Sequence, residues 1–205
     1  MKKYVIGLDE VGRGPLAGPV VVGAALIPKN LRIRDENLGI PKDSKQLNPK
    51  RRENWLRYFK NHPEIFYVTA RVEPKVIDKI NISAAANSAA WRAFRSVLRK
   101  SGVAENKAEV FLDGGLYLRK RGFYARSKTV IKGDEKIPAI SIASIIAKVC
   151  RDKLMGRMAR KHPGYGFEIH KGYGTKTHYS ALRRLGPSAI HRLTFLKKKH
   201  KITKS

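Results

Sequence analysis

The chain has 205 residues, of which 42% are hydrophobic, and 44 Lys and Arg face only 16 Asp and Glu, a formal net charge of +28. Length and composition exclude a disordered chain and are typical of one globular domain, with at most a small appendage. The charge indicates a polyanionic partner, most simply a nucleic acid, and no basic amphipathic helix favours a membrane surface. Residues 151–205 hold 15 Lys and Arg against 2 Asp and Glu. We therefore expect the nucleic-acid face there, the alternative being a solvated tail that only promotes solubility.

The cysteine content and the N-terminus indicate a cytoplasmic protein, which we expect to be a monomer. The single cysteine, Cys150, excludes a disulfide within the chain, and its apolar helical setting predicts a buried thiol. Residues 4–8 are too few for the apolar region of a signal peptide. The longest uncharged run, 14–28, is broken by glycine and proline and is too short to span a membrane.

Strands and helices alternate along the chain in a pattern that predicts an α/β fold. Runs rich in β-branched and aromatic residues predict strands at 4–8, 19–27, 64–72, 108–112 and 129–132. Capping signals and strong helix formers predict helices that begin at Asn48-Pro49 and span 82–100, 138–160 and 175–185. This order predicts a five-stranded mixed sheet flanked by helices, with a helical C-terminal extension.

The stretch GLDEVGRGPLAGP, residues 7–19, places Asp9 and Glu10 directly before a glycine-rich turn. Its glycines match the spacing of a dinucleotide-binding loop, G-x-G-x-x-G/A. That loop opens a helix, whereas Pro19 and a β-branched strand follow here. The two carboxylates would also repel a pyrophosphate, so we disfavour a dinucleotide site.

Carboxylates beside a phosphate make chemical sense if a divalent metal lies between them. Two Mg²⁺ or Mn²⁺ ions roughly 4 Å apart can activate a water and stabilise a leaving oxygen, and hard cations take oxygen ligands. Asp9 and Asp113 each end a predicted strand, which makes them candidate ligands. Asp134 lies just ahead of the long helix at 138–160, and its position alone favours a capping or turn role.

Five motifs, in chain order, resemble those of bacterial ribonuclease HII. They are DEVGRG at 9–14, DSK at 43–45, LDG at 112–114, KGD at 132–134 with ISIASIIAKV and RD at 140–152, and HKGYGT at 170–175. The resemblance implies an RNase H-like fold and a divalent-metal-dependent endonuclease. Such an enzyme hydrolyses the RNA strand of RNA–DNA hybrids and nicks 5′ of ribonucleotides embedded in duplex DNA, leaving a 3′-hydroxyl and a 5′-phosphate.

The resemblance also implies a role for each matching residue. The metal-binding, catalytic carboxylates would be Asp9, Glu10, Asp113 and Asp134, and for Asp134 this overrides the capping interpretation. The substrate-binding residues would be Gly12, Arg13, Gly14, Lys45, Ser144, Lys148 and Tyr173. Among these, the Gly-Arg-Gly turn would detect the ribose 2′-hydroxyl and Tyr173 would pack on the next deoxyribose. Val11 and Ile142 replace alanines of the family pattern, which we expect to alter packing only.

Domain organisation and the competing functions follow from the same motifs. We divide the chain into a catalytic core at 1–161, a helical substrate-binding segment at 162–196 and a basic tail at 197–205 that we expect to be disordered. A non-enzymatic RNA-binding protein would explain the charge but not the strand-end carboxylates. A DNA-directed nuclease on the same fold is the closer alternative, and the Gly12–Gly14 turn argues against it. The related ribonuclease HIII, with its extra N-terminal domain, is disfavoured because the first strand begins at Tyr4.

Overall fold

The computed structural model describes residues 3–41, 44, 46–120, 123–124 and 127–200. A five-stranded sheet in the order β3-β2-β1-β4-β7 forms its centre. The strands are β1 (Tyr4–Val11), β2 (Val20–Pro28), β3 (Phe66–Val72), β4 (Ala108–Asp113) and β7 (Ser127–Val130). Pairing is antiparallel between β1 and β2 and between β2 and β3, and parallel between β1 and β4 and between β4 and β7. The predicted five-stranded mixed sheet is therefore confirmed.

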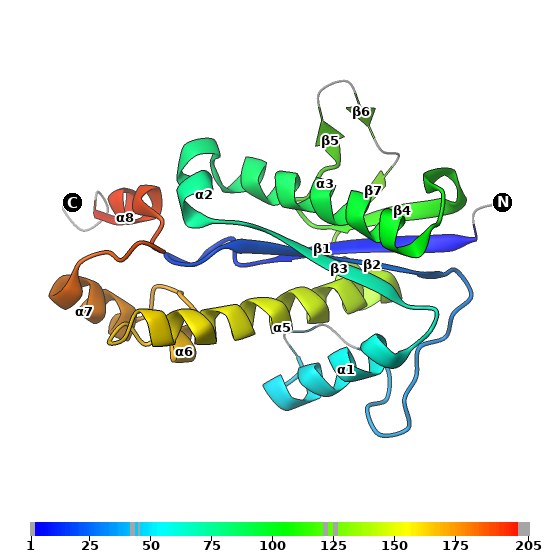
Figure 1. Cartoon of the computed structure of the whole chain (residues 1–205), viewed down its shortest axis with the longest axis horizontal. Helices are drawn as coiled ribbons and strands as arrows, with labels where there is room; N and C mark the ends of the chain where they lie inside the picture. The colour runs from blue at the N-terminus through cyan, green and yellow to red at the C-terminus, as the bar shows by residue number, and fades with distance from the viewer. Residues whose placement is uncertain (1–2, 42–43, 45, 121–122, 125–126, 201–205) are drawn as a thin grey trace.

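Helices cover both faces of this sheet (Figure 1). One face carries α2 (Pro74–Ile80) and α3 (Ile82–Ser101), and the other carries α5 (Pro138–Lys161) with α1 (Pro49–Asn61) beside it. The capping signals act as predicted: Asn48 accepts a hydrogen bond from the first turn of α1, and Gly102, with φ of +69°, ends α3.

Shorter elements fill the rest of the described chain. They are the 3₁₀ helix η1 (Glu105–Lys107), the two-stranded ribbon β5 (Arg119–Lys120) and β6 (Phe123–Tyr124), and the helices α4 (Gly133–Lys136), α6 (Phe167–His170), α7 (Lys176–Leu185) and α8 (Leu193–His200). Residues 197–200, which the sequence analysis assigned to a disordered tail, are helical in α8. Residues 201–205 of that tail lie outside the described residues.

Two glycines allow α5 to lie directly on the sheet. A Cβ atom on Gly7 would lie 2.2 Å from the carbonyl carbon of Ala139, and one on Gly23 would lie 2.3 Å from the carbonyl oxygen of Ala143. Any side chain at these positions in β1 and β2 would push the helix away. The close contact brings the buried first turns of α5, including Ser144, against the strand that carries Asp9.

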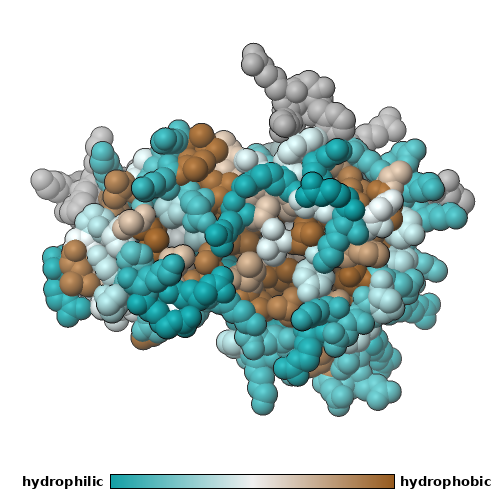
Figure 2. Space-filling view, viewed as in Figure 1, coloured by the Kyte–Doolittle hydropathy of each residue, from teal (hydrophilic) through white to brown (hydrophobic). Residues whose placement is uncertain are grey.

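The surface and the single thiol complete the description. The face seen in Figure 2 is bordered by hydrophilic residues, with apolar residues gathered along its middle. Within the described ranges, no helix is long and apolar enough to cross a membrane. Cys150, which we expected to be buried, is half-buried, and its Sγ lies 3.6 Å from Oγ1 of Thr69.

Candidate active site

Two parallel strands bring the first acids to the same edge of the sheet. Leu8 in β1 pairs with Leu112 in β4, so Asp9 and Asp113 follow at the same level. Asp113 Oδ1 accepts a hydrogen bond of 2.8 Å from the backbone N–H of Gly133. This bond attaches α4 to the end of β4 and places the buried Asp134, only 5% exposed, in the adjoining position. Strand pairing thus joins the ends of β1 and β4, and this hydrogen bond joins the end of β4 to α4.

Strand β1 continues through Glu10 to Val11, further than the predicted strand at 4–8. The backbone N–H of Glu10 donates to Asp9 Oδ1 at 2.7 Å. Arg13 Nη1 lies 3.2 Å from Glu10 Oε1. This partly buried ion pair links the acid to residues 12–18, which connect β1 to β2 and are called the glycine loop below. The second carboxylate oxygen, Oε2, is buried and has no hydrogen-bond partner within the described part of the protein.

Burial, reinforced by neighbouring negative charge, destabilises the ionised forms of Asp9 and Glu10 at this edge. Burial raises the pKa of Asp9 well above its usual value, and the negative charges of Glu10 and Asp113 raise it further, against a lowering by the hydrogen bond with Ser144. Burial also raises the pKa of Glu10; Arg13 opposes this shift and Asp113 adds to it. A bound cation would stabilise the ionised forms of Asp9 and Glu10 in this environment.

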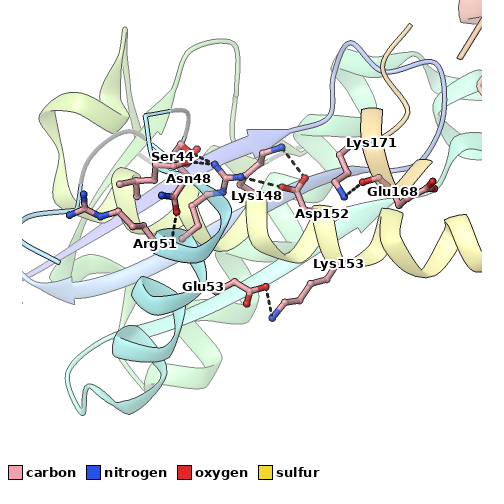
Figure 3. A network of polar contacts seen from close by, with 12 residues as sticks. Ser44, Asn48, Arg51, Glu53, Lys148, Asp152, Lys153, Glu168 and Lys171 are labelled. Carbon is pink, nitrogen blue, oxygen red and sulfur yellow. Dashed lines mark hydrogen bonds and ion pairs between the residues drawn. The ribbon is translucent and has the colours of Figure 1, made fainter. Parts of the chain in front are cut away.

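Helix α5 supplies the polar residues beneath Asp9. Besides its bond with Asp9, Ser144 lies 2.8 Å from Ser44, oxygen to oxygen. Lys148, one turn further along, instead donates from Nζ to Asp152 Oδ1 at 2.8 Å (Figure 3). Ser144 is therefore at the carboxylate cluster, whereas the Lys148 ammonium group is held by a neighbour on its own helix. Lys45, the remaining predicted phosphate contact, lies outside the described residues.

The glycine loop and Tyr173 lie side by side. Gly12 has φ of +90°, which favours glycine, and a Cβ atom on Gly14 would lie 4.0 Å from Cε1 of the Tyr173 ring. The Tyr173 side chain is 43% exposed, and its ring centroid lies 5.8 Å from Cζ of Arg151. The structure thus joins the loop to an accessible aromatic ring on one side and, through Arg13 and Glu10, to the acids on the other.

Sequence reasoning missed two buried groups next to this site. Arg151 and Arg192 are fully buried, and both donate hydrogen bonds to carbonyl oxygens of the glycine loop. Arg151 belongs to the RD pair of the motif at 140–152, which could have drawn attention to it, whereas no sequence pattern indicated Arg192.

Three stacked or tilted histidine rings also gather below Tyr173: His170, His178 and His191. His178 is fully buried and hydrogen-bonds the carbonyl oxygen of Tyr173 through Nδ1 at 2.9 Å. Tyr165 and Phe167 stack in parallel next to these rings.

The donor set suits a hard divalent cation, although its side chains are not drawn together. Among the described residues, no group of three or more His, Cys, Asp or Glu side chains is arranged so that it could hold a metal ion as it stands. The donors that meet here are nevertheless all carboxylate oxygens, which Mg²⁺ and Mn²⁺ prefer. The orphaned, buried Glu10 Oε2 and the raised pKa of Asp9 both fit a missing positive charge.

Comparison with known proteins places the chain in a family. A family model described as ribonuclease HII matches residues 6–199. The ribonuclease HII of Caldicellulosiruptor bescii is 40% identical over 195 residues, covering 95% of this chain and 87% of that protein. The crystal structure of ribonuclease H2 from Pyrococcus horikoshii OT3 has a TM-score of 0.66 and 26% identity, covering 98% of this chain and 100% of that one.

A further solved structure supports the fold alone. Bst-RNase HIII in complex with Mn²⁺ has a TM-score of 0.73 but 21% identity, covering 99% of this chain and 71% of that one. The expected RNase H-like fold is confirmed by these likenesses. Because the family match also spans the strand-end acids, the glycine loop and Tyr173, the chain belongs to the ribonuclease HII family and is a ribonuclease.

Proposed function

We propose that this protein is an endonuclease that hydrolyses the RNA strand of RNA–DNA hybrids and nicks duplex DNA on the 5′ side of an embedded ribonucleotide, leaving a 3′-hydroxyl and a 5′-phosphate. The observation that carries this proposal is the meeting of the acids of β1 and β4 beside the Gly12–Gly14 turn. Membership of the ribonuclease HII family supports the choice of an RNA substrate.

The residues that would hold the divalent ions, Mg²⁺ or Mn²⁺, are Asp9, Glu10, Asp113 and Asp134. Two such ions would supply an activated water and neutralise charge on the leaving oxygen. Asp9 and Glu10 carry raised pKa values in this structure, so cation binding and loss of their protons would be coupled. Since the acids are not yet arranged around an ion, binding would have to draw their side chains closer together and free Glu10 from Arg13.

Recognition of a single ribonucleotide would depend on the glycine loop and on Tyr173. The 2′-hydroxyl is both a donor and an acceptor, and it distinguishes RNA from DNA at one nucleotide. Because Gly12 and Gly14 lack side chains, backbone N–H and C=O groups could approach that hydroxyl closely. The half-exposed Tyr173 ring beside Gly14 would pack against the neighbouring sugar where no hydroxyl intervenes.

Affinity without sequence preference would come from the basic surface. Lys and Arg side chains would contact phosphates, and the segment at 162–196 would supply part of this surface along with Tyr173. The division into a catalytic core at 1–161 and a substrate-binding segment at 162–196 is part of this proposal. The monomeric state stays a prediction.

A nicking assay tests the proposal. The protein is incubated with Mg²⁺ or Mn²⁺ and a labelled DNA duplex that contains one ribonucleotide, with the all-DNA duplex and single-stranded RNA as controls. We expect one nick on the 5′ side of the ribonucleotide and cleavage of a matched RNA–DNA hybrid. Cleavage of the all-DNA duplex would favour the DNA-directed nuclease. Binding of every duplex without any cleavage would favour the non-enzymatic RNA-binding protein.

A further inference from the structure

A buried guanidinium group from the C-terminal segment lies beneath the glycine loop. Arg192 precedes α8 and is fully buried. Its Nε donates to the carbonyl oxygen of Gly18 at 2.9 Å, and its Nη1 donates to that of Arg13 at 2.8 Å. Its Nη2 donates to the carbonyl oxygens of Gly12 at 2.6 Å and of Gly18 at 2.7 Å. One side chain therefore binds both ends of the loop between β1 and β2.

This guanidinium depends on the loop for its hydrogen bonds, although the charge of Asp78 favours its charged form. Within the described ranges, Arg192 forms no ion pair; the nearby Asp78 instead accepts the N–H groups of Leu193 and Thr194 at 2.9 and 3.0 Å, at the start of α8. Cζ of Arg192 lies over the Phe195 ring, 5.1 Å from the ring centroid. A buried charge is costly unless it is hydrogen-bonded, and here loop carbonyl oxygens supply those bonds. Any loop shape that turned these oxygens away would leave the charge unsatisfied.

Backbone hydrogen bonds join the same two segments. The N–H of Arg192 donates to the carbonyl oxygen of Leu16 at 2.8 Å, and the N–H of Gly18 donates to that of Ile190 at 2.9 Å. An isolated bridge pairs Ala17 with His191. The C-terminal segment and the loop thus form one hydrogen-bonded unit, although they are more than 170 residues apart in sequence.

We infer that Arg192 is a positioning residue for ribonucleotide recognition: its fork of donors holds the Gly12–Gly18 loop in the shape that meets the substrate. This inference rests on the proposed function, in which the same loop detects the 2′-hydroxyl. Arg192 itself is buried beneath the loop, so it acts through Gly12 and Arg13 rather than by touching the substrate. Helix α8, anchored by Asp78, keeps Arg192 in place.

The test compares Arg192→Lys and Arg192→Met with a matched control, Arg92→Met. Lysine keeps the positive charge but not the planar fork, so it separates hydrogen-bond geometry from charge. Arg92 lies on α3, outside the proposed substrate-binding segment; it is exposed and donates to the carbonyl oxygens of Arg71 at 2.6 Å and Ser88 at 3.4 Å. Each folded variant is assayed for kcat and KM on the duplex with one ribonucleotide, and for duplex affinity in the absence of catalytic metal.

We expect both Arg192 variants to lose about 100-fold in kcat, the scale of loss that a misplacement of about 1 Å can cause, with duplex affinity within about threefold of the original. Arg92→Met should keep kcat and change affinity only slightly. Wild-type kcat in a folded Arg192→Lys variant would overturn the inference. A loss of duplex affinity without a loss of kcat would also overturn it, because it would make Arg192 a phosphate or stability residue.

Hydrogen exchange of the peptide that contains residues 12–18 supplies a readout that needs no activity. The amides of this peptide should exchange faster in Arg192→Lys than in Arg92→Met, and equal rates would contradict the inference. If the original protein fails to nick the ribonucleotide, the proposed function is wrong while this measurement still decides whether Arg192 holds the loop.

Should the Arg192 variants fail to fold, Asp78→Asn, which weakens the anchor of α8, replaces them in the exchange experiment; unchanged exchange there would contradict the inference.

Discussion

Two neighbouring regions of this molecule treat buried charge in opposite ways. Toward the ends of β1 and β4, the buried Asp9 and the partly buried Glu10 lie beside Asp113, and the pKa values of Asp9 and Glu10 are raised. Beneath the glycine loop, Arg151 and Arg192 are buried together, but backbone carbonyl oxygens surround them. Burial lowers the pKa of both arginines, that of Arg192 to about 9.

The difference separates acids suited to a cation from Arg192, whose donors are used on the loop, although the buried Nη1 of Arg151 has no hydrogen-bond partner among the described residues. The acids leave Glu10 Oε2 without a hydrogen-bond partner among the described residues, which suits an incoming cation. Arg192, in contrast, already uses its donors on the loop, so its role is to hold backbone in place. Substitutions in the first region should therefore abolish chemistry, and substitutions in the second should misplace it.

The largest expected effect is that of Asp113→Asn. The amide oxygen can still accept the hydrogen bond from Gly133, but the charge that would bind the metal is lost. Mutating a residue that only supports a metal ligand typically lowers activity about 10–100-fold. Because Asp113 would itself bind the metal, we expect hydrolysis to fall by more than about 100-fold, with duplex binding retained. Glu109→Gln is the matched control and should stay active. Glu109 lies on β4, as Asp113 does, but it forms an ion pair with Lys29. Metal-dependent cleavage at the original rate by Asp113→Asn would refute its role.

A smaller effect is expected for Gly12→Ala. A Cβ atom there would lie 2.3 Å from Nε of Arg151 and 2.9 Å from the carbonyl oxygen of Pro19, at a φ of +90°. The loop must shift, and we expect nicking at a single ribonucleotide to fall by about 100-fold. Gly102→Ala is the control, because Gly102 also has positive φ but no atom lies within 4 Å of the added carbon. Equal nicking rates for the two variants would show that loop shape is unimportant.

The smallest effect concerns pH and His191. Burial, together with the charge of His178, lowers the pKa of His191 from 6.5 to about 4. Below pH 6.5 the unfolded chain therefore binds a proton that the folded chain does not, so stability should fall as the pH falls from 6.5 toward 4. The slope for one such group approaches about 1.4 kcal/mol per pH unit.

Urea unfolding of the protein and of His191→Gln at pH 7.5, 6.5 and 5.5 measures this slope. The comparison with the variant is needed because the raised pKa values of Asp9 and Glu10 have the opposite effect on stability. They make the folded chain bind extra protons, which increases the free energy of unfolding as the pH falls. The free energy of unfolding should fall less steeply in His191→Gln. Parallel curves would mean that His191 is protonated in the folded state.

Local patterns predicted the fold well and the supporting residues poorly. The cap at Asn48, the stop at Gly102 and the β-branched runs depend on near neighbours, so the corresponding elements lie close to their predicted ranges. Helix α4 and the ribbon of β5 and β6 were missed, because elements of two to four residues carry too little periodicity. The tail was predicted to be disordered because it is a chain terminus, yet its first residues continue α8, whose first turn Asp78 caps from α2.

The site was predictable only where chemistry appears in the sequence itself. Acids that follow apolar strands, and glycines after them, are visible as letters, whereas the partners of a buried arginine are set by tertiary structure. Arg192 meets Gly12 across 180 positions, and no spacing rule connects them. For Lys148, in contrast, a motif predicted substrate binding, whereas its side chain donates a hydrogen bond to Asp152 on its own helix.

The most direct measurement is a crystal structure of the protein with Mn²⁺, located by anomalous scattering. We predict two Mn²⁺ ions about 4 Å apart, bound by carboxylate oxygens of Asp9, Glu10, Asp113 and Asp134. Manganese bound elsewhere, or these four side chains turned away from one another at full Mn²⁺ saturation, would contradict the account.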